Sequence, residues 1–187
     1  MTAATTTWHI DPAHTHVEFA VRHLMIATVK GKFTEVRGTV TMAGEDPTHA
    51  AVEVTIGAPS ITTGIEQRDQ HLRSPDFLDA ERFPTLEFRS RKIEAAGEGG
   101  PDSFRITGDL TIKDVTREIV LTVTPQGLVQ DPWGGVRAGY SAAASLRRSD
   151  FGITWNQLIE AGGVAVGDQV RLEVEVELVR EALPVAA

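Results

Sequence analysis

The chain alternates apolar and polar residues over most of its length, a pattern typical of β-strands that bury one face. The clearest run lies near the C-terminal end, from Val170 to Leu178. Its valines and leucines alternate with one arginine and three glutamates. One face of this strand is therefore apolar and the other charged, as in a sheet that is wet on one side only.

The same period of two predicts seven further strands, at about 15–21, 29–42, 52–58, 85–93, 104–112, 119–123 and 136–146. Between Val29 and Met42 the apolar parity switches, and a β-bulge near Thr34–Val36 accounts for the switch. An open sheet of this length would expose its edges, and closure into a barrel removes them. The pattern predicts one all-β domain over residues 1–187, an eight-stranded antiparallel β-barrel with its core at about 8–180 and flexible termini.

One segment, from Gln67 to Pro84, departs from the alternation. Its apolar residues fall near helical spacing, so one side of it can lie on a hydrophobic surface. Ser74 and Phe83 each precede a proline, which moves them out of the α region. The sequence therefore predicts a short amphipathic helix and a tight bend, with the region Glu66 to Phe83 packed at one end of the barrel.

Barrels of about eight strands are either filled by side chains or hold one small ligand. The size of the interior side chains therefore bears on whether this barrel can bind a ligand. Six positions expected to face inward are small: Gly31, Ala58, Gly108, Ala138, Ala142 and Ala144. Small residues leave space for an apolar guest, and they equally allow close packing. The sequence leaves both readings open.

Composition excludes several classes of function. The chain of 187 residues has no cysteine, which excludes disulfides, thiolate metal sites and cysteine nucleophiles. Its net charge of −8 argues against binding to nucleic acid, which needs clustered basic residues. No apolar run is long enough for a stable membrane span. The N-terminal residues lack the basic and apolar regions of a secretory signal, so we expect a cytoplasmic protein.

Two clusters suggest site chemistry. His14, His16 and Glu18 are spaced to share one face of a strand, but Glu18 would lie about 13 Å from His14. We therefore predict no metal site, although a pair of histidines with a third ligand from elsewhere stays open. Asp69 and His71 resemble a catalytic pair, yet residues two apart on a helix do not face each other. Without an activated nucleophile, no catalytic site is predicted.

Five phrases in sequence order resemble the YceI-like family of lipid- and polyisoprenoid-binding proteins. They are WHIDPAHTHVEFAVRHL, VKGKFTEVRGTV, SITTGIEQRDQHLRSPDFLDAERFPTLEFRS, GDLTIKDVTREIVL, and RSDFGI with VGDQVRLEVEVEL, which together run from Trp8 to about Leu178. The resemblance implies a lipocalin-like barrel of eight antiparallel strands whose apolar interior encloses an isoprenoid chain. Two departures are that many members have serine at the position of Thr15 and that many are exported.

The resemblance and the strand parity together lead us to expect a binder or carrier of an amphiphilic lipid, such as a polyisoprenoid or an isoprenoid quinone precursor. We expect it to act without catalysis and without a cofactor. The residues expected to line the cavity are Phe19, Val21, Phe33, Ile106, Leu110, Ala142, Leu146, Phe151, Trp155 and Val174. The candidates for contact with a lipid head group are His23, Arg68, His71 and Arg148.

Two alternatives remain at this point. One is an enzyme that acts on such a lipid, with His23 or His71 as acid–base. The other is a structural or stress-related protein whose barrel is filled. The expected partner is an isoprenoid or quinone-like lipid, with no nucleic acid and no stable membrane insertion, and a homodimer is left open.

Overall fold

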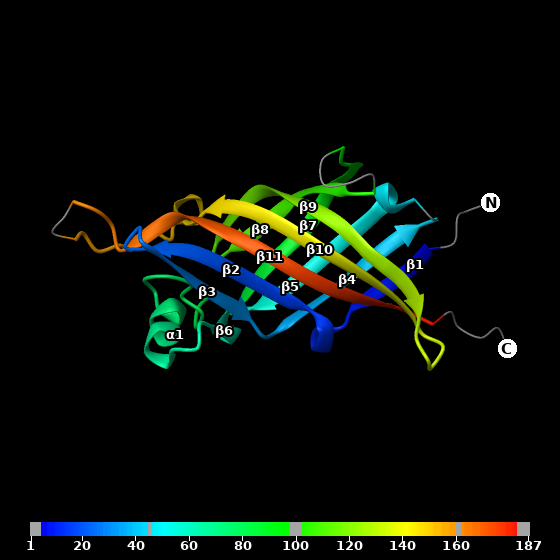
Figure 1. Cartoon of the computed structure of the whole chain (residues 1–187), viewed down its shortest axis with the longest axis horizontal. Coiled ribbons are helices and arrows are strands. Elements are labelled where there is room, and N and C mark those ends of the chain that lie inside the picture. Colours follow the sequence, from blue (N-terminus) through cyan, green and yellow to red (C-terminus); the bar gives the residue numbers. More distant parts are fainter. Residues whose placement is uncertain (1–4, 45, 98–101, 160–161, 183–187) are drawn as a thin grey trace.

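A computed structural model describes residues 5–44, 46–97, 102–159 and 162–182, and these form a barrel with one α-helix at its end (Figure 1). The predicted flexibility of the termini concerns residues that lie largely outside this range. The described strands are β1 (Thr5–Ile10), β2 (His16–His23), β3 (Ala27–Phe33), β4 (Val36–Ala43), β5 (Ala50–Gly57), β6 (Ile61–Thr62), β7 (Thr85–Ala95), β8 (Phe104–Ile112), β9 (Val115–Gln130), β10 (Val136–Arg147) and β11 (Val166–Arg180). The helices are α1 (Glu66–Arg73) and four 3-10 turns, η1 (Pro12–His14), η2 (Pro47–His49), η3 (Ala58–Ser60) and η4 (Arg148–Phe151).

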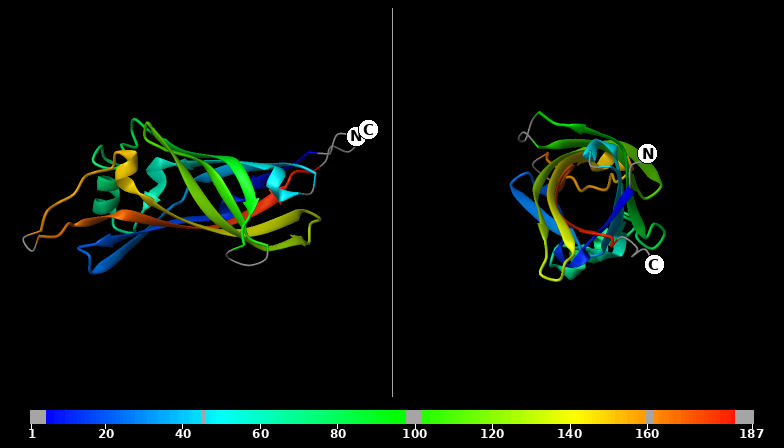
Figure 2. Two further views of the ribbon diagram at one scale, coloured as in Figure 1. Left: turned by 90° about the horizontal axis from the view of Figure 1, so that it is seen from above. Right: turned by 90° about the vertical axis from the view of Figure 1, so that its right-hand side faces the viewer.

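The strands close into a ring in the order β1-β4-β5-β7-β8-β9-β10-β11, and β1 pairs with β11 to complete it. Every pairing in this ring is antiparallel. Strands β2, β3 and β6 prolong β1, β4 and β5 toward one end, where β2 also pairs with β11. The predicted eight-stranded antiparallel barrel is confirmed, and Figure 2 shows the ring end-on.

The first barrel strand is built from two pieces, β1 and β2, which η1 separates. Asp11 caps η1 by accepting a hydrogen bond from the Ala13 amide at 3.0 Å, and Pro12 occupies its first turn. β1 was not among the predicted strands. The prediction that His14 and His16 share one strand is wrong, because His14 ends η1 and β2 begins at His16.

The second barrel strand changes its parity at Thr34 and Glu35, between β3 and β4. This two-residue irregularity falls where the apolar pattern predicted a bulge. Ser60 Oγ accepts the amide hydrogens of both residues, at 3.1 and 3.0 Å. The break lets Phe33 and Val36 both point into the core despite their odd spacing.

Helix α1 is anchored by a buried carboxylate, that of Asp69, which is only 2% exposed. Its Oδ2 accepts from Thr62 Oγ1 at 2.8 Å, and its Oδ1 accepts from the amide and hydroxyl of Thr63. Burial raises the pKa of Asp69, but these hydrogen bonds outweigh it and hold the pKa below its ordinary value. α1 and the turns after it therefore sit firmly over one end of the barrel (Figure 1). No helix in the described residues is long and apolar enough to span a membrane.

Two of the small inward positions serve close packing. A Cβ on Gly31 would lie 2.3 Å from the ring of Phe19, and one on Gly108 would lie 2.5 Å from the Arg89 carbonyl and 2.6 Å from the ring of Phe88. At these positions the space left by glycine is filled by a neighbouring phenylalanine.

Gly108→Ala is expected to destabilise the barrel by about 1–3 kcal/mol, because the backbone carbonyl of Arg89 cannot move away from the new methyl group. Gly139→Ala is the matched control: it also lies in a strand, and its nearest neighbour would be 3.4 Å away. Urea denaturation of both variants measures the difference. Equal stability of the two would contradict the packing described for Gly108.

Candidate functional site

The barrel encloses a cavity of about 400 Å³, a size within the roughly 300–1,000 Å³ of small-molecule sites. Its wall is contributed by β1, β2, β4, β5 and β7 to β11, so it follows the full ring of strands. The lining is almost wholly aliphatic and aromatic. The lining residues that carry a side-chain nitrogen or oxygen are Trp8, Thr15 and Tyr140, and no charged residue among those described lines it.

One end of the cavity is closed by a floor, a cluster of buried apolar residues beneath α1. Phe151 and Ala58 are each only 1% exposed, and Phe33, Phe77 and Ile153 are buried with them. These residues come from β3, η3, η4 and the turns next to α1 and η4, which meet at this end of the barrel (Figure 1). The cluster also includes wall residues of the cavity, so wall and floor are continuous.

The opposite end of the cavity is its mouth, where β1 begins and β11 ends. Here the lining includes Pro47 in η2, which is exposed, and Leu128 in β9, which is 66% exposed. Exposed lining residues occur at this end, whereas Val17, Val36 and Leu110 near the floor are buried. In the part of the barrel that the structure describes, the cavity is thus a pocket open at one end rather than a channel.

The ten residues expected to line the cavity fall into two groups. Those on the cavity wall are Ile106, Leu110, Ala142 and Val174. Those at or beside the floor are Phe33 and Phe151, which are buried in it, and Phe19, Leu146 and Trp155, which pack against it. Val21 is half-buried on β2 toward the same end.

The four head-group candidates all lie at the α1 end, and none of them lines the cavity. His23 is exposed at the end of β2. Arg68 donates to the hydroxyl and carbonyl of Thr63 at 2.7 and 3.2 Å. His71 Nε2 lies 2.8 Å from Asp76 Oδ2. The floor separates these groups from the cavity.

Arg148, the fourth candidate, is buried and fastens the segment that follows η4. Its guanidinium donates to the carbonyls of Ile153, Trp155, Val166 and Gly167 at 2.8–3.2 Å. Burial lowers the pKa of Arg148, and nearby Asp168 partly offsets this. Four of its five N–H groups are thereby used for structure.

Sequence reasoning missed Trp8 and Tyr140 as wall residues. Trp8 lies on β1, the strand that was overlooked, although Trp8 and Ile10 alternate with polar neighbours as strand residues do. Tyr140 shares the apolar parity of Ala142 on β10, so the pattern contained the signal for it.

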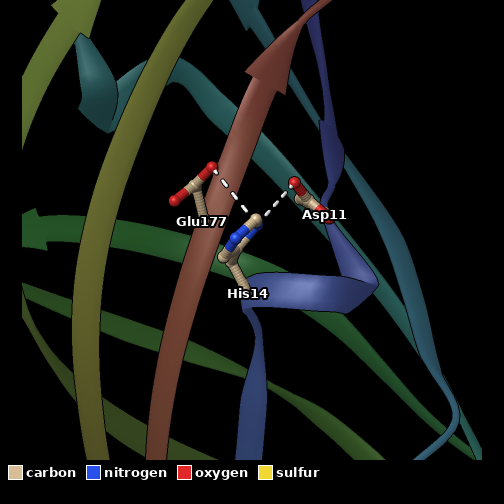
Figure 3. A group of neighbouring side chains, drawn as sticks. All are labelled: Asp11, His14 and Glu177. Carbon is tan, nitrogen blue, oxygen red and sulfur yellow. Dashed lines mark hydrogen bonds and ion pairs between the residues drawn. The ribbon is translucent and has the colours of Figure 1, made fainter. Parts of the chain in front are cut away.

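The structure brings His14 together with Asp11 and Glu177 rather than with His16 (Figure 3). One ligand atom from each of the three lies within 4.8 Å of the others. His14 Nδ1 is 3.0 Å from Asp11 Oδ2 and 3.8 Å from Glu177 Oε1. The hydrogen bond to Asp11, followed by the charge of Glu177, raises the pKa of His14, and the same bond lowers the pKa of Asp11.

A guanidinium already occupies the centre of this carboxylate group. Arg137 Nη1 donates to Asp11 Oδ2 at 2.9 Å and to Glu177 Oε1, and its Nε donates to Asp131 Oδ2 at 2.8 Å. Hydrogen bonding from Arg137 also lowers the pKa of Asp131. We interpret the group as an ion-pair network that ties β10, β11 and the β1–η1 junction together, with Arg137 in the position a metal ion would need.

Comparisons with known proteins agree on one family. The model described as the YceI-like domain matches residues 8–178. The UPF0312 protein of Pseudomonas aeruginosa (strain LESB58) is 39% identical over 140 residues, which cover 75% of this chain and 71% of that protein. The crystal structure of the Campylobacter jejuni YCEI protein matches with a TM-score of 0.71 at 30% identity, over 86% of this chain and 90% of that one. A polyisoprenoid binding domain from Saccharophagus degradans has the same fold, with a TM-score of 0.66 at 16% identity over 94% and 98% of the two chains.

Arg137→Met is expected to lower the thermal unfolding midpoint at neutral pH, because it leaves three carboxylates close together without their cation. The pKa values of Asp11 and Asp131 lie below their ordinary value of 3.8, so the interactions of the two carboxylates stabilise the fold fully above pH 3.8. This stabilisation is lost as the pH falls through the lowered pKa values. The deficit of the variant should therefore shrink in acid.

The matched control is Arg147→Met on the same strand, where the side chain is 68% exposed and pairs with Asp150. Its effect is expected to be small at every pH. Calorimetric unfolding of both variants across acidic and neutral pH measures the difference. A deficit in Arg137→Met that does not change with pH would contradict the ion-pair interpretation.

Proposed function

This chain belongs to the YceI-like family, and we propose that it binds and carries an amphiphilic lipid, such as a polyisoprenoid or an isoprenoid quinone precursor, with the apolar chain enclosed in the barrel. The observation that carries the proposal is the cavity itself, which is apolar along its wall, floored at one end and open at the other. A site of this shape favours a long, thin molecule that is apolar over most of its length.

Burial of the ligand chain supplies the affinity. Each methylene group that leaves water contributes about 0.8 kcal/mol, before the cost of ordering the chain is subtracted. The wall is built on paired strands and includes buried residues such as Leu110 and Leu178, so the ligand has little protein to order when it enters. The solved structure from Saccharophagus degradans supports the proposal, since it shares this fold and is described as a polyisoprenoid binding domain.

The lining supports binding over catalysis. Among the described residues it contains no carboxylate, imidazole or amine that could transfer a proton to an enclosed lipid. His71, one acid–base candidate, packs edge-on against Phe77 and Trp155 with ring centroids 5.0 and 4.7 Å away, and it pairs with Asp76. His23, the other, is exposed on β2 at the α1 end. We therefore propose a carrier without a cofactor.

The alternative of a filled barrel is disfavoured by the cavity of about 400 Å³. A well-packed interior leaves few voids larger than a water molecule. The choice between a polyisoprenoid and a quinone precursor stays open, and so does a homodimer. The cytoplasmic location stays a prediction.

The purified protein is expected to co-purify with a long-chain lipid or to take up a prenol or quinone when one is added, because the cavity wall is continuously apolar. Native mass spectrometry, followed by solvent extraction and identification of the released molecule, measures both outcomes. A protein that carries no lipid and takes up neither class would refute the proposal.

Ala142→Trp is expected to block the cavity and to reduce the uptake of a long chain by about tenfold or more. Displacing only two methylene groups already costs about 1.6 kcal/mol of burial. Ala143→Trp is the matched control, because the next residue on β10 points outward and is exposed. Lipid titration of both variants decides: equal uptake would show that the ligand does not occupy the part of the barrel next to Ala142.

A further inference from the structure

We propose that the lipid carries an uncharged hydrogen-bonding group, a hydroxyl or a carbonyl, and that the Tyr140 hydroxyl and the Trp8 indole N–H hold it in the mouth half of the cavity. The inference rests on the proposed function, since it assigns the polar part of the same ligand. It starts from the two polar groups on the wall that the protein leaves without partners.

Trp8 lines the cavity, and only 8% of its surface is exposed. Its indole N–H makes no hydrogen bond to any of the residues that the structure describes. In the same residues, no side-chain nitrogen or oxygen is both shut off from solvent and without a partner. The indole N–H is therefore accessible, and because Trp8 lines the cavity we infer that a ligand there can reach it.

Tyr140 is half-buried on β10, and its hydroxyl likewise has no partner among the described residues. Burial raises the pKa of Tyr140, so the phenol stays protonated at neutral pH. It can then both donate and accept one hydrogen bond. The third polar side chain of the wall, Thr15, already accepts the amide hydrogen of Glu177 at 3.3 Å.

The two residues that carry the unpartnered groups belong to the same part of the wall. Trp8 and Tyr140 belong to one apolar cluster with Ala138 and Leu178, in which β1, β10 and β11 meet. Leu178 is near the end of β11 and Ala138 near the start of β10, so this cluster lies in the mouth half of the barrel. A ligand held here by its polar group would extend its apolar chain toward the floor.

The charge of that group follows from the rest of the wall. Among the described residues, no cation lines the cavity to pair with a diphosphate or a carboxylate; the guanidinium of Arg180 lies over the Trp8 ring, 5.9 Å from its centroid, but at the end of β11 and not on the wall. An unpaired charge is expensive to remove from water, whereas a hydroxyl or carbonyl needs only one or two hydrogen bonds to be satisfied. The lining therefore selects against a charged head inside the cavity and favours a prenol or a quinone-like carbonyl.

The test uses three probes of one carbon number: geranylgeraniol, geranylgeranyl diphosphate and the hydrocarbon phytane. Equilibrium binding is measured by native mass spectrometry and by displacement of a fluorescent polyene. The wild-type chain is expected to bind geranylgeraniol about tenfold or more tightly than the diphosphate. Tyr140→Phe should weaken the binding of geranylgeraniol by about 3- to 10-fold, the value of one net hydrogen bond, and leave phytane within about twofold.

Trp8→Phe, with its aromatic ring retained, should show the same selective loss for geranylgeraniol. Unfolding midpoints of both variants without ligand check that the barrel is intact. The inference is overturned if the diphosphate binds as tightly as the alcohol, or if both variants weaken alcohol and hydrocarbon equally. If none of the three probes binds to the wild-type chain, the proposed function falls, and the inference with it.

Discussion

The closure of the sheet between β1 and β11 is the constraint on which the rest of the structure depends. Three residue pairs join β1 to β11, with Trp8 opposite Arg180 and Ile10 opposite Leu178 at the two ends, and β2 continues the seam with seven more. Closure leaves the sheet with no open edge. The apolar faces of its eight strands point inward, so they must enclose either side chains or a guest. The ion-pair network of Arg137 with Asp11 and Glu177 lies beside this seam and joins β11 to the junction that follows β1.

The ends of the barrel are unlike, and this asymmetry turns a closed ring into a pocket. At one end β2, β3 and β6 extend beyond the ring, and α1, η3 and η4 bring buried residues such as Phe77 and Phe151 across it. At the other end exposed Leu128 and Pro47 border the cavity. A guest has one way in, and its far end meets an apolar floor.

Polar chemistry is distributed in a way that fits this shape. Buried polar groups at the α1 end, such as Asp69 and Arg148, are consumed by hydrogen bonds that hold the floor in place. Those left free on the wall, on Trp8 and Tyr140, are uncharged. Since a buried charge without a partner is far more costly than an uncharged donor, the wall can accept a polar group of the ligand without accepting an ion.

The sequence by itself determined the strands, because burial of alternate residues is a local pattern with a fixed period. The run Phe104–Ile112 was placed to the residue, and the helix ended before Pro75 because proline constrains the residue that precedes it. The β1 strand was lost because Pro12 and η1 interrupt the first barrel strand after only six residues.

Only the tertiary structure decided whether the barrel is full and at which end it opens. Gly31 and Gly108 looked like vacant space, yet the rings of Phe19 and Phe88 fill it, while Ala142 lines a real cavity. The four head-group candidates have the right chemistry for polar contacts, but the floor lies between them and the ligand space. Periodicity shows which face a residue takes, whereas cavity and mouth depend on which distant side chains arrive on that face.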